Sequence, residues 1–85
     1  MEYLHLVPIM ERLTPIFRRV LKQPQLTPTV DMTAEMVKGW DSLSHIQLIV
    51  AIEKEFNIKF DIKEIIEFKN IGEMATCISH KQRKS

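Results

Sequence analysis

The stretch from Asp41 to His45 contains residue types that could do chemistry. An aspartate stands directly before Ser42, and a histidine follows that serine by three residues. A serine nucleophile needs a base within hydrogen-bond reach, and that base must be oriented by a third group. His5, His45 and His80 are scattered along the chain. We therefore assign no catalytic residue.

The position of Ser42 favours binding of a phosphate. Asp41 is a good N-cap, because its carboxylate can accept from the free amides of a first helical turn, and Ser42 then takes the first helical position. A hydroxyl there lies at the positive end of the helix, where amides and the macrodipole stabilise a phosphate. Alternatively, Ser42 is only a helix-start residue that helps to cap its own turn.

The elements that must position this serine are helical. The first predicted helix runs from about Pro8 to Leu21. Pro15 removes one of its backbone hydrogen bonds, so that either the helix kinks there or Thr14 caps a new start. The apolar residues at the spacing of one buried face are Ile9, Leu13, Ile16, Phe17 and Val20.

A long segment, residues 22–39, leads to the serine. Its prolines and turn residues predict a loop, and a connection of this length in a small domain is usually functional or pinned to the core. We expect Leu26, Val30, Met36 and Val37 to pin it. Trp40 is expected to anchor its end to the core.

Three further helices complete the predicted all-α fold. The second runs from Leu43 to Phe56, the short third starts near Asp61, and the last is capped by Asn70. Their apolar positions are Leu43, Ile46, Ile49, Val50, Ile52 and Phe56; then Ile62, Ile65 and Ile66; then Ile71, Met74, Ala75 and Ile78, with Cys77 beside them. The predicted architecture is a four-helix bundle with a long loop between helices 1 and 2 and a short third helix.

Length and composition limit the classes of function. A chain of 85 residues makes one domain and buries only about 60–65% of its unfolded surface, so a deep catalytic cleft is not expected. One cysteine excludes an internal disulfide, and no clustered Cys or His residues predict a metal site. The stretch "MEYLHLVPIM" lacks the basic region and long apolar run of a secretory signal, and the longest apolar run, "LIVAI", is too short to span a bilayer. We expect a cytoplasmic protein with one domain at residues 1–80 and a basic tail at 81–85.

The charge distribution argues against nucleic-acid binding. Residues 23–80 carry five basic and nine acidic side chains, a net charge of −4, whereas basic residues gather at the two ends. A nucleic-acid binder concentrates basic residues on its reading helix. If the protein were a helix-turn-helix DNA-binding domain, its recognition helix would carry only one basic residue, Lys54.

The stretch "GWDSLSHIQLIVAIEKEF", residues 39–56, resembles the motif of acyl carrier proteins and related peptidyl carriers. Ser42 matches the serine that bears 4'-phosphopantetheine in that family, which a phosphopantetheinyl transferase takes from coenzyme A. Gly39 matches the glycine of the preceding turn, and Phe56 matches the aromatic residue that closes the second helix. The order of the helices and the length of the first loop also match over most of the chain.

The resemblance implies a stand-alone carrier, which is a tether and not a catalyst. Its arm would hold an acyl or aminoacyl group as a thioester. Asp41 is expected to position the serine and the metal that the transferase uses, while Leu43 packs under the serine and contributes to transferase recognition. Other implied partners are a loading ligase and an accepting transferase or synthase, and we expect the carrier to be a monomer.

The resemblance also places a partner surface on the second helix, at Ser44, His45, Gln47, Glu53 and Glu55. Familiar bacterial fatty-acid carriers have carboxylates at the positions of Ser44 and Gln47, and both are neutral here. Electrostatic steering should therefore be weaker, which favours a dedicated, specialised pathway. His45 could approach the phosphate as a cation, but we interpret it as an ordinary exposed helix histidine.

An acyl pocket is implied between the second and third helices. The residues at matching positions, each of which is also a plausible core residue, are Ile46, Ile49, Ile52, Phe56, Phe60, Ile65 and Phe68. Large side chains packed at normal density leave little room, so we expect a short or polar cargo. The alternative function is a helical protein-interaction module in which Ser42 is not modified and the apolar helix face pairs with a partner.

Overall fold

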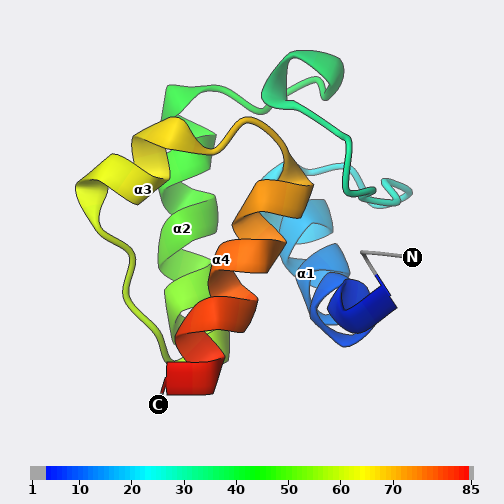
Figure 1. Ribbon diagram of the computed structural model, residues 1–85. Helices are drawn as coiled ribbons and strands as arrows, with labels where there is room; N and C mark the ends of the chain where they lie inside the picture. The colour runs from blue at the N-terminus through cyan, green and yellow to red at the C-terminus, as the bar shows by residue number, and fades with distance from the viewer. Residues whose placement is uncertain (1–3, 85) are drawn as a thin grey trace.

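Four α-helices build the fold, and the computed structural model describes residues 4–84 (Figure 1). No strand occurs among these residues, as the sequence predicted. The α-helices are α1 (Val7–Val20), α2 (Ser42–Phe56), α3 (Ile62–Glu67) and α4 (Ile71–Lys84), and the 3₁₀ turns are η1 (Leu4–Leu6) and η2 (Ala34–Met36). α2 and α4 run in the same general direction and α1 runs the other way (Figure 1).

Helix α1 passes through Pro15 without a break. The Thr14 hydroxyl donates to the carbonyl of Met10, 2.9 Å away and one turn back in the same helix. Thr14 therefore does not cap a new start, and that alternative is wrong. The predicted buried face is confirmed for Ile9, Leu13, Ile16 and Phe17, whereas Val20 is half-buried.

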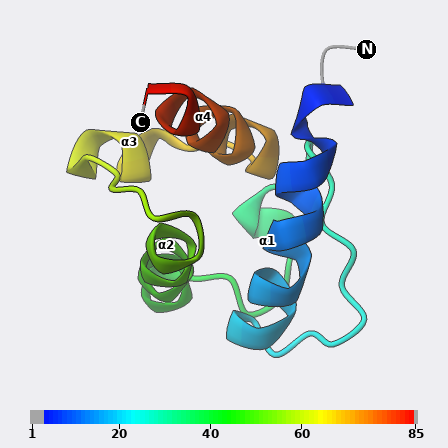
Figure 2. The same ribbon diagram turned by 90° about the horizontal axis from the view of Figure 1, so that it is seen from below.

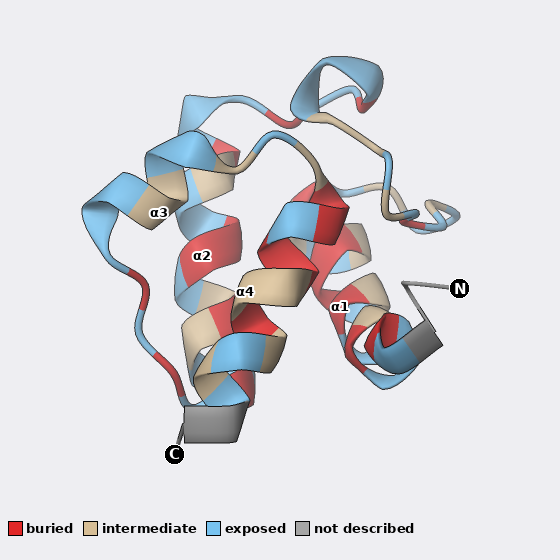
Figure 3. Cartoon of the chain, viewed as in Figure 1, coloured by how far each residue is buried: buried red, intermediate tan, exposed pale blue. Residues whose placement is uncertain are grey.

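The core lies where α1, α2 and α4 face one another. Buried residues form bands on the inward sides of these three helices (Figure 3), and α3 lies beside α4 at the edge of the bundle (Figure 2). α3 itself contributes no fully buried residue. Removing apolar surface from water holds the three long helices together, and α3 depends on fewer contacts.

The loop of residues 22–39 is ordered by hydrogen bonds to two helices. Arg18 Nε donates to the carbonyl of Leu26 at 2.7 Å. The backbone amides of Ile71 and Gly72 donate to the carbonyls of Met32 and Val30, at 3.0 and 2.7 Å. Those amides are at the start of α4 and have no partner inside the helix, so the loop satisfies them.

The loop is also packed against the core, as predicted, but not by every expected residue. Val37 is buried, and Leu26 and Val30 pack partly against the core. Met36 is 64% exposed. The prediction for Met36 is wrong because the residue ends the short turn η2 and its side chain lies in solvent.

Helix α4 continues beyond the predicted domain boundary at residue 80 and ends at Lys84. Lys81 Nζ lies 3.0 Å from Glu64 Oε1, which ties the end of α4 to α3. The predicted tail at 81–85 is therefore helical through residue 84, and Ser85 lies outside the described residues. Within residues 4–84, no helix is long and apolar enough to cross a membrane.

Gly72→Ala should loosen the loop from α4. A Cβ at this position would lie 2.8 Å from the carbonyl oxygen of Val30, which also accepts the Gly72 amide. We expect the free energy of unfolding to fall by about 1–3 kcal/mol, as overpacking typically costs. Urea unfolding would measure it, with His80→Ala at an exposed position of α4 as the control. Unchanged stability in Gly72→Ala would contradict the close contact.

Candidate functional site

The start of α2 is held by a reciprocal pair of hydrogen bonds. Asp41 Oδ1 accepts from the Ser44 amide at 2.9 Å, and Ser44 Oγ accepts from the Asp41 amide at 2.8 Å. The Ser44 hydroxyl also donates to the carbonyl of Gly39 at 2.7 Å. Asp41 is thus the N-cap that the sequence predicted. The role of Ser44 was missed, although a polar residue three positions after a cap is the spacing of a capping box.

Gly39 allows the chain to turn into this cap. Its φ is 90°, in the left-handed region that side-chain-bearing residues rarely adopt. A Cβ would also approach the carbonyl oxygen of Leu21 to 3.4 Å. The turn thus brings the Gly39 carbonyl into reach of Ser44.

Ser42 is left exposed at the first position of α2. Its neighbour Ser44 makes the cap, so the Ser42 hydroxyl is not needed for the fold. Leu43 is 69% exposed, and the prediction that it packs under the serine is wrong. As the second helical residue, Leu43 projects from the outer side of the turn, beside the serine.

The surroundings of Ser42 fit a phosphodiester. The hydroxyl is accessible, and the first amides of a 15-residue helix lie next to it. The hydrogen bonds that Ser44 donates through its amide and its hydroxyl lower the pKa of the Asp41 carboxyl. Asp41 is therefore ionised at neutral pH and able to attract a cation next to the serine.

Trp40 and His45 connect the serine end of α2 to α3. The indole Nε1 of Trp40 donates to His45 Nδ1 at 3.1 Å, and His45 Nε2 lies 3.1 Å from the carbonyl oxygen of Ile65. Because the indole can only donate, His45 carries its proton on Nε2 and donates it to Ile65. Trp40 is buried and packs edge-on against Phe17, with ring centroids 5.3 Å apart, so its predicted anchoring role is confirmed.

The interpretation of His45 as an ordinary exposed histidine is wrong. Its ring is half-buried and stacked beside Trp40, with both nitrogens in hydrogen bonds. The carbonyls at the end of a short helix have no intrahelical partner, and His45 satisfies that of Ile65. His45 therefore holds α3 in place.

Only part of the predicted partner surface is exposed and free. Ser44 is 7% exposed and belongs to the cap, so assigning it to a partner surface is wrong. Glu53 is half-buried, and its carboxylate accepts from the Phe60 amide at 2.9 Å. Glu55 is exposed but forms an ion pair with Arg12 at 3.1 Å. Gln47 is exposed, whereas His45 is committed to the Ile65 carbonyl.

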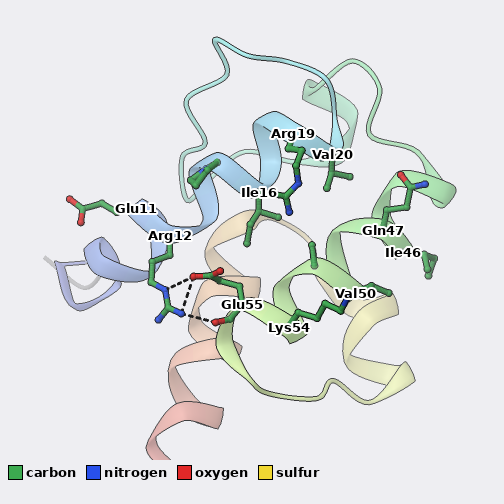
Figure 4. A pocket seen from close by; sticks show the side chains of 12 residues that line it. Glu11, Arg12, Ile16, Arg19, Val20, Ile46, Gln47, Val50, Lys54 and Glu55 are labelled. Atoms are coloured by element: carbon green, nitrogen blue, oxygen red, sulfur yellow. Dashed lines mark hydrogen bonds and ion pairs between the residues drawn. The ribbon is translucent and has the colours of Figure 1, made fainter.

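The residues of the predicted acyl pocket divide between core and surface. Ile49, Ile52, Phe56 and Phe60 are buried, and Ile65 and Phe68 are half-buried. Ile46 is 52% exposed and points out of the bundle (Figure 4), so it lines no internal pocket. This follows from its place on the outer side of α2, opposite the buried Leu48.

The cavity between the serine end of α2 and the end of α3 is small. A cavity of about 60 Å³ lies among Trp40, His45, Phe68 and Met74. The rings of Phe60 and Phe68 meet edge to face, 5.5 Å between centroids, and fill the region next to it. Close packing of these large side chains leaves no room for a long chain unless α3 moves.

The one thiol of the chain is held unreactive. Cys77 Sγ donates to Glu64 Oε2 at 3.6 Å. Burial, with the nearby Glu64 carboxylate as a second cause, raises the pKa of the Cys77 thiol to about 11. At neutral pH the nucleophilic thiolate is scarce. Among the described residues, no group of three His, Cys, Asp or Glu side chains could hold a metal ion.

The family model described as "Phosphopantetheine attachment site" matches residues 11–78. The chain belongs to this carrier family. It is similar to the solution structure of a holo acyl carrier protein from Geobacter metallireducens, with 37% identity over 92% of this chain and 90% of that chain and a TM-score of 0.85. A Mycobacterium tuberculosis structure described as an acyl carrier protein shares 25% identity over 84% of this chain and 95% of that chain, with a TM-score of 0.76. No curated protein gives a significant match.

Membership establishes the fold and the class of function. The carrier adopts the acyl-carrier-protein fold that the sequence predicted. Its cofactor is covalently bound phosphopantetheine, and its function is that of an acyl carrier protein. It therefore interacts with a phosphopantetheinyl transferase and with acyl-handling enzymes.

The two serines at the start of α2 should differ in what they contribute. Ser44→Ala removes the hydroxyl that accepts from the Asp41 amide and donates to the Gly39 carbonyl, while the backbone amide at position 44 can still donate to Asp41. We expect it to lower the free energy of unfolding by about 1–2 kcal/mol. Ser42→Ala removes an exposed hydroxyl and should change it by less than about 0.5 kcal/mol. Thermal or urea unfolding of the two variants beside the parent checks this. Equal effects in the two variants would refute the division of roles.

Acid should weaken the cap at Asp41. The folded-state pKa of this carboxyl is lowered from its ordinary value of 3.8, so its contribution is present above that value and lost as the pH falls through the folded pKa. Asp41→Asn keeps a capping oxygen without the titration, and its stability should depend less on pH below about 4. Urea unfolding at neutral pH and at several acidic values measures this. Parallel pH profiles for the two proteins would count against it.

Proposed function

We propose that Ser42 is the residue that carries phosphopantetheine and presents a thioester-bound acyl or aminoacyl group to partner enzymes of a specialised pathway. The observation that carries the proposal is the exposed Ser42 hydroxyl at the N-terminus of α2, within the region that the family model matches. When bound, the group supplies a thiol on a long flexible arm, which holds the cargo as a thioester.

The residues around Ser42 support its modification in different ways. In the transfer step, the serine oxygen forms a phosphoester bond, the nucleotide part of coenzyme A leaves, and a base of the transferase takes the serine proton. The Asp41–Ser44 cap holds the serine at the helix start. The ionised Asp41 carboxylate is available to the metal that the transferase uses, and the exposed Leu43 offers an apolar contact to that enzyme.

The packing beside α3 supports a short or polar cargo, such as an aminoacyl group. The cavity among Trp40, His45 and Phe68 is only about 60 Å³. A long acyl chain would have to displace α3 from the Ile65–His45 hydrogen bond. A ligase would load such a cargo and a transferase or synthase would accept it.

The protein acts as a tether and not as an enzyme in this proposal. Among residues 4–84, no histidine hydrogen-bonds a serine hydroxyl, and His45 is engaged with Trp40 and Ile65. The raised pKa of Cys77 keeps that thiol from competing with the arm for the cargo. A monomer that works in the cytoplasm fits this role, and the single free cysteine is consistent with a reducing compartment.

Intact-protein mass spectrometry tests the attachment site. The protein is incubated with coenzyme A, magnesium and a broad-specificity phosphopantetheinyl transferase, beside Ser42→Ala and the control Ser79→Ala. We expect the parent and the control to gain one phosphopantetheine and Ser42→Ala to gain none. Modification of Ser42→Ala would move the site elsewhere. If none of the folded proteins gained mass, the helical interaction module would be the better interpretation.

A further inference from the structure

A groove with a volume of about 820 Å³ runs between α1 and α2 (Figure 4). Ile16 and Val20 line it from α1, and Ile46 and Val50 line it from α2. Ile46 and Val50 are 52% and 50% exposed. The floor of the groove is therefore apolar and open to a partner.

This apolar surface leads to the serine. Leu43, Ile46 and Val50 are spaced three and four residues apart and share one stripe of α2. Leu43 is the residue directly after Ser42, and all three side chains are at least half exposed. Contiguous exposed apolar side chains of this kind mark an interaction site.

Among the described residues, three unpaired charged side chains line the groove, and two of them are positive. Arg19 on α1 and Lys54 on α2 are exposed and line the groove, and neither has a carboxylate partner among residues 4–84. Arg19 reaches between the two helices, whereas the acidic Glu11 points away from it (Figure 4).

Two further charges that line the groove neutralise each other. Arg12 pairs with Glu55, and its guanidinium stacks on the Phe56 ring 4.2 Å away. The Glu53 carboxylate is bound to the Phe60 amide. The acidic residues of α2 are thus engaged inside the molecule, and the cations Arg19 and Lys54 remain for a partner.

We propose that the α1–α2 groove docks an amphipathic helix of a partner protein, whose apolar side chains meet Ile46 and Val50 and whose carboxylates meet Arg19 and Lys54. An interhelical groove of this kind accommodates an added helix through apolar anchors at helical spacing. A second copy of the chain is disfavoured, because a two-fold contact would bring the same free cations near one another. This inference rests on the proposed function, because it identifies the face of the carrier on which the enzymes that receive its cargo bind.

The test is a titration of the ¹⁵N-labelled full chain, with and without phosphopantetheine, against designed helical peptides of about 18 residues, or about five turns. One peptide has a leucine stripe flanked by glutamates, and its matched control has lysines in place of the glutamates. We expect the acidic peptide to shift amide signals of residues 16–20 and 43–54, with an affinity that falls as salt is added. The basic peptide should bind at least about tenfold more weakly.

Charge-reversal variants make the test specific. The double variant Arg19→Glu/Lys54→Glu should lose about tenfold or more in affinity for the acidic peptide and gain affinity for the basic one. Lys59→Glu/Lys63→Glu makes the same change in net charge at exposed cations that do not line the groove, and should leave both affinities unchanged. Retained helical circular dichroism shows that each variant is folded.

Three results would overturn the proposal: no binding of the acidic peptide, equal binding of both peptides, or shifts confined to α3 and α4. Self-association of the chain through this groove, detected by sedimentation, would overturn it as well. Mass spectrometry of the same samples reports the modification of Ser42 independently. Binding of the acidic peptide without modification of Ser42 would support the docking surface and refute the proposed function. Modification of Ser42 without peptide binding would support the proposed function and refute the docking surface.

Discussion

The start of α2 depends on the reciprocal hydrogen bonds between Asp41 and Ser44. A helix leaves its first amides without internal partners, and a small domain has little other surface with which to satisfy them. Asp41 and Ser44 solve this locally, and the Gly39 carbonyl completes the arrangement by accepting the Ser44 hydroxyl. Because Asp41 and Ser44 make the cap, the Ser42 hydroxyl is not needed for it. An exposed hydroxyl can therefore be held at a fixed place at the start of the helix.

The same end of the molecule also organises the rest of the fold. Trp40, next to the cap, is anchored on Phe17 of α1 and donates to His45, which in turn holds the carbonyl of Ile65 in α3. α3 contributes no fully buried residue, and its attachment combines the partial burial of Ile65 with these polar contacts and the Glu64–Lys81 ion pair. An element held mainly by hydrogen bonds opens at lower cost than one held by a buried apolar face.

The surface of α2 separates two kinds of charge. Its glutamates are used inside the molecule, Glu53 on the Phe60 amide and Glu55 on Arg12, while Lys54 projects freely beside an apolar stripe. A side chain that is already paired adds little to the attraction of a partner, whereas an unpaired one at the rim of an apolar groove sets the sign of the complementary charge. The net charge of a segment, counted from the sequence, therefore differs from the charge that its surface offers to a partner, because the count includes side chains that are already paired.

Local and periodic features were determined by the sequence alone. The spacing of Ile9, Leu13, Ile16 and Phe17 predicted the buried face of α1, Asp41 predicted the cap, and the residues around Ser42 predicted the family. These succeed because helix periodicity and capping act over a few residues. Tertiary structure alone decided that His45 reaches Ile65, that Leu43 and Ile46 face solvent, and that α4 continues to Lys84 through the pairing of Lys81 with Glu64. Each of these depends on which helix lies opposite, and residues 13 to 20 positions apart meet only after the chain has folded.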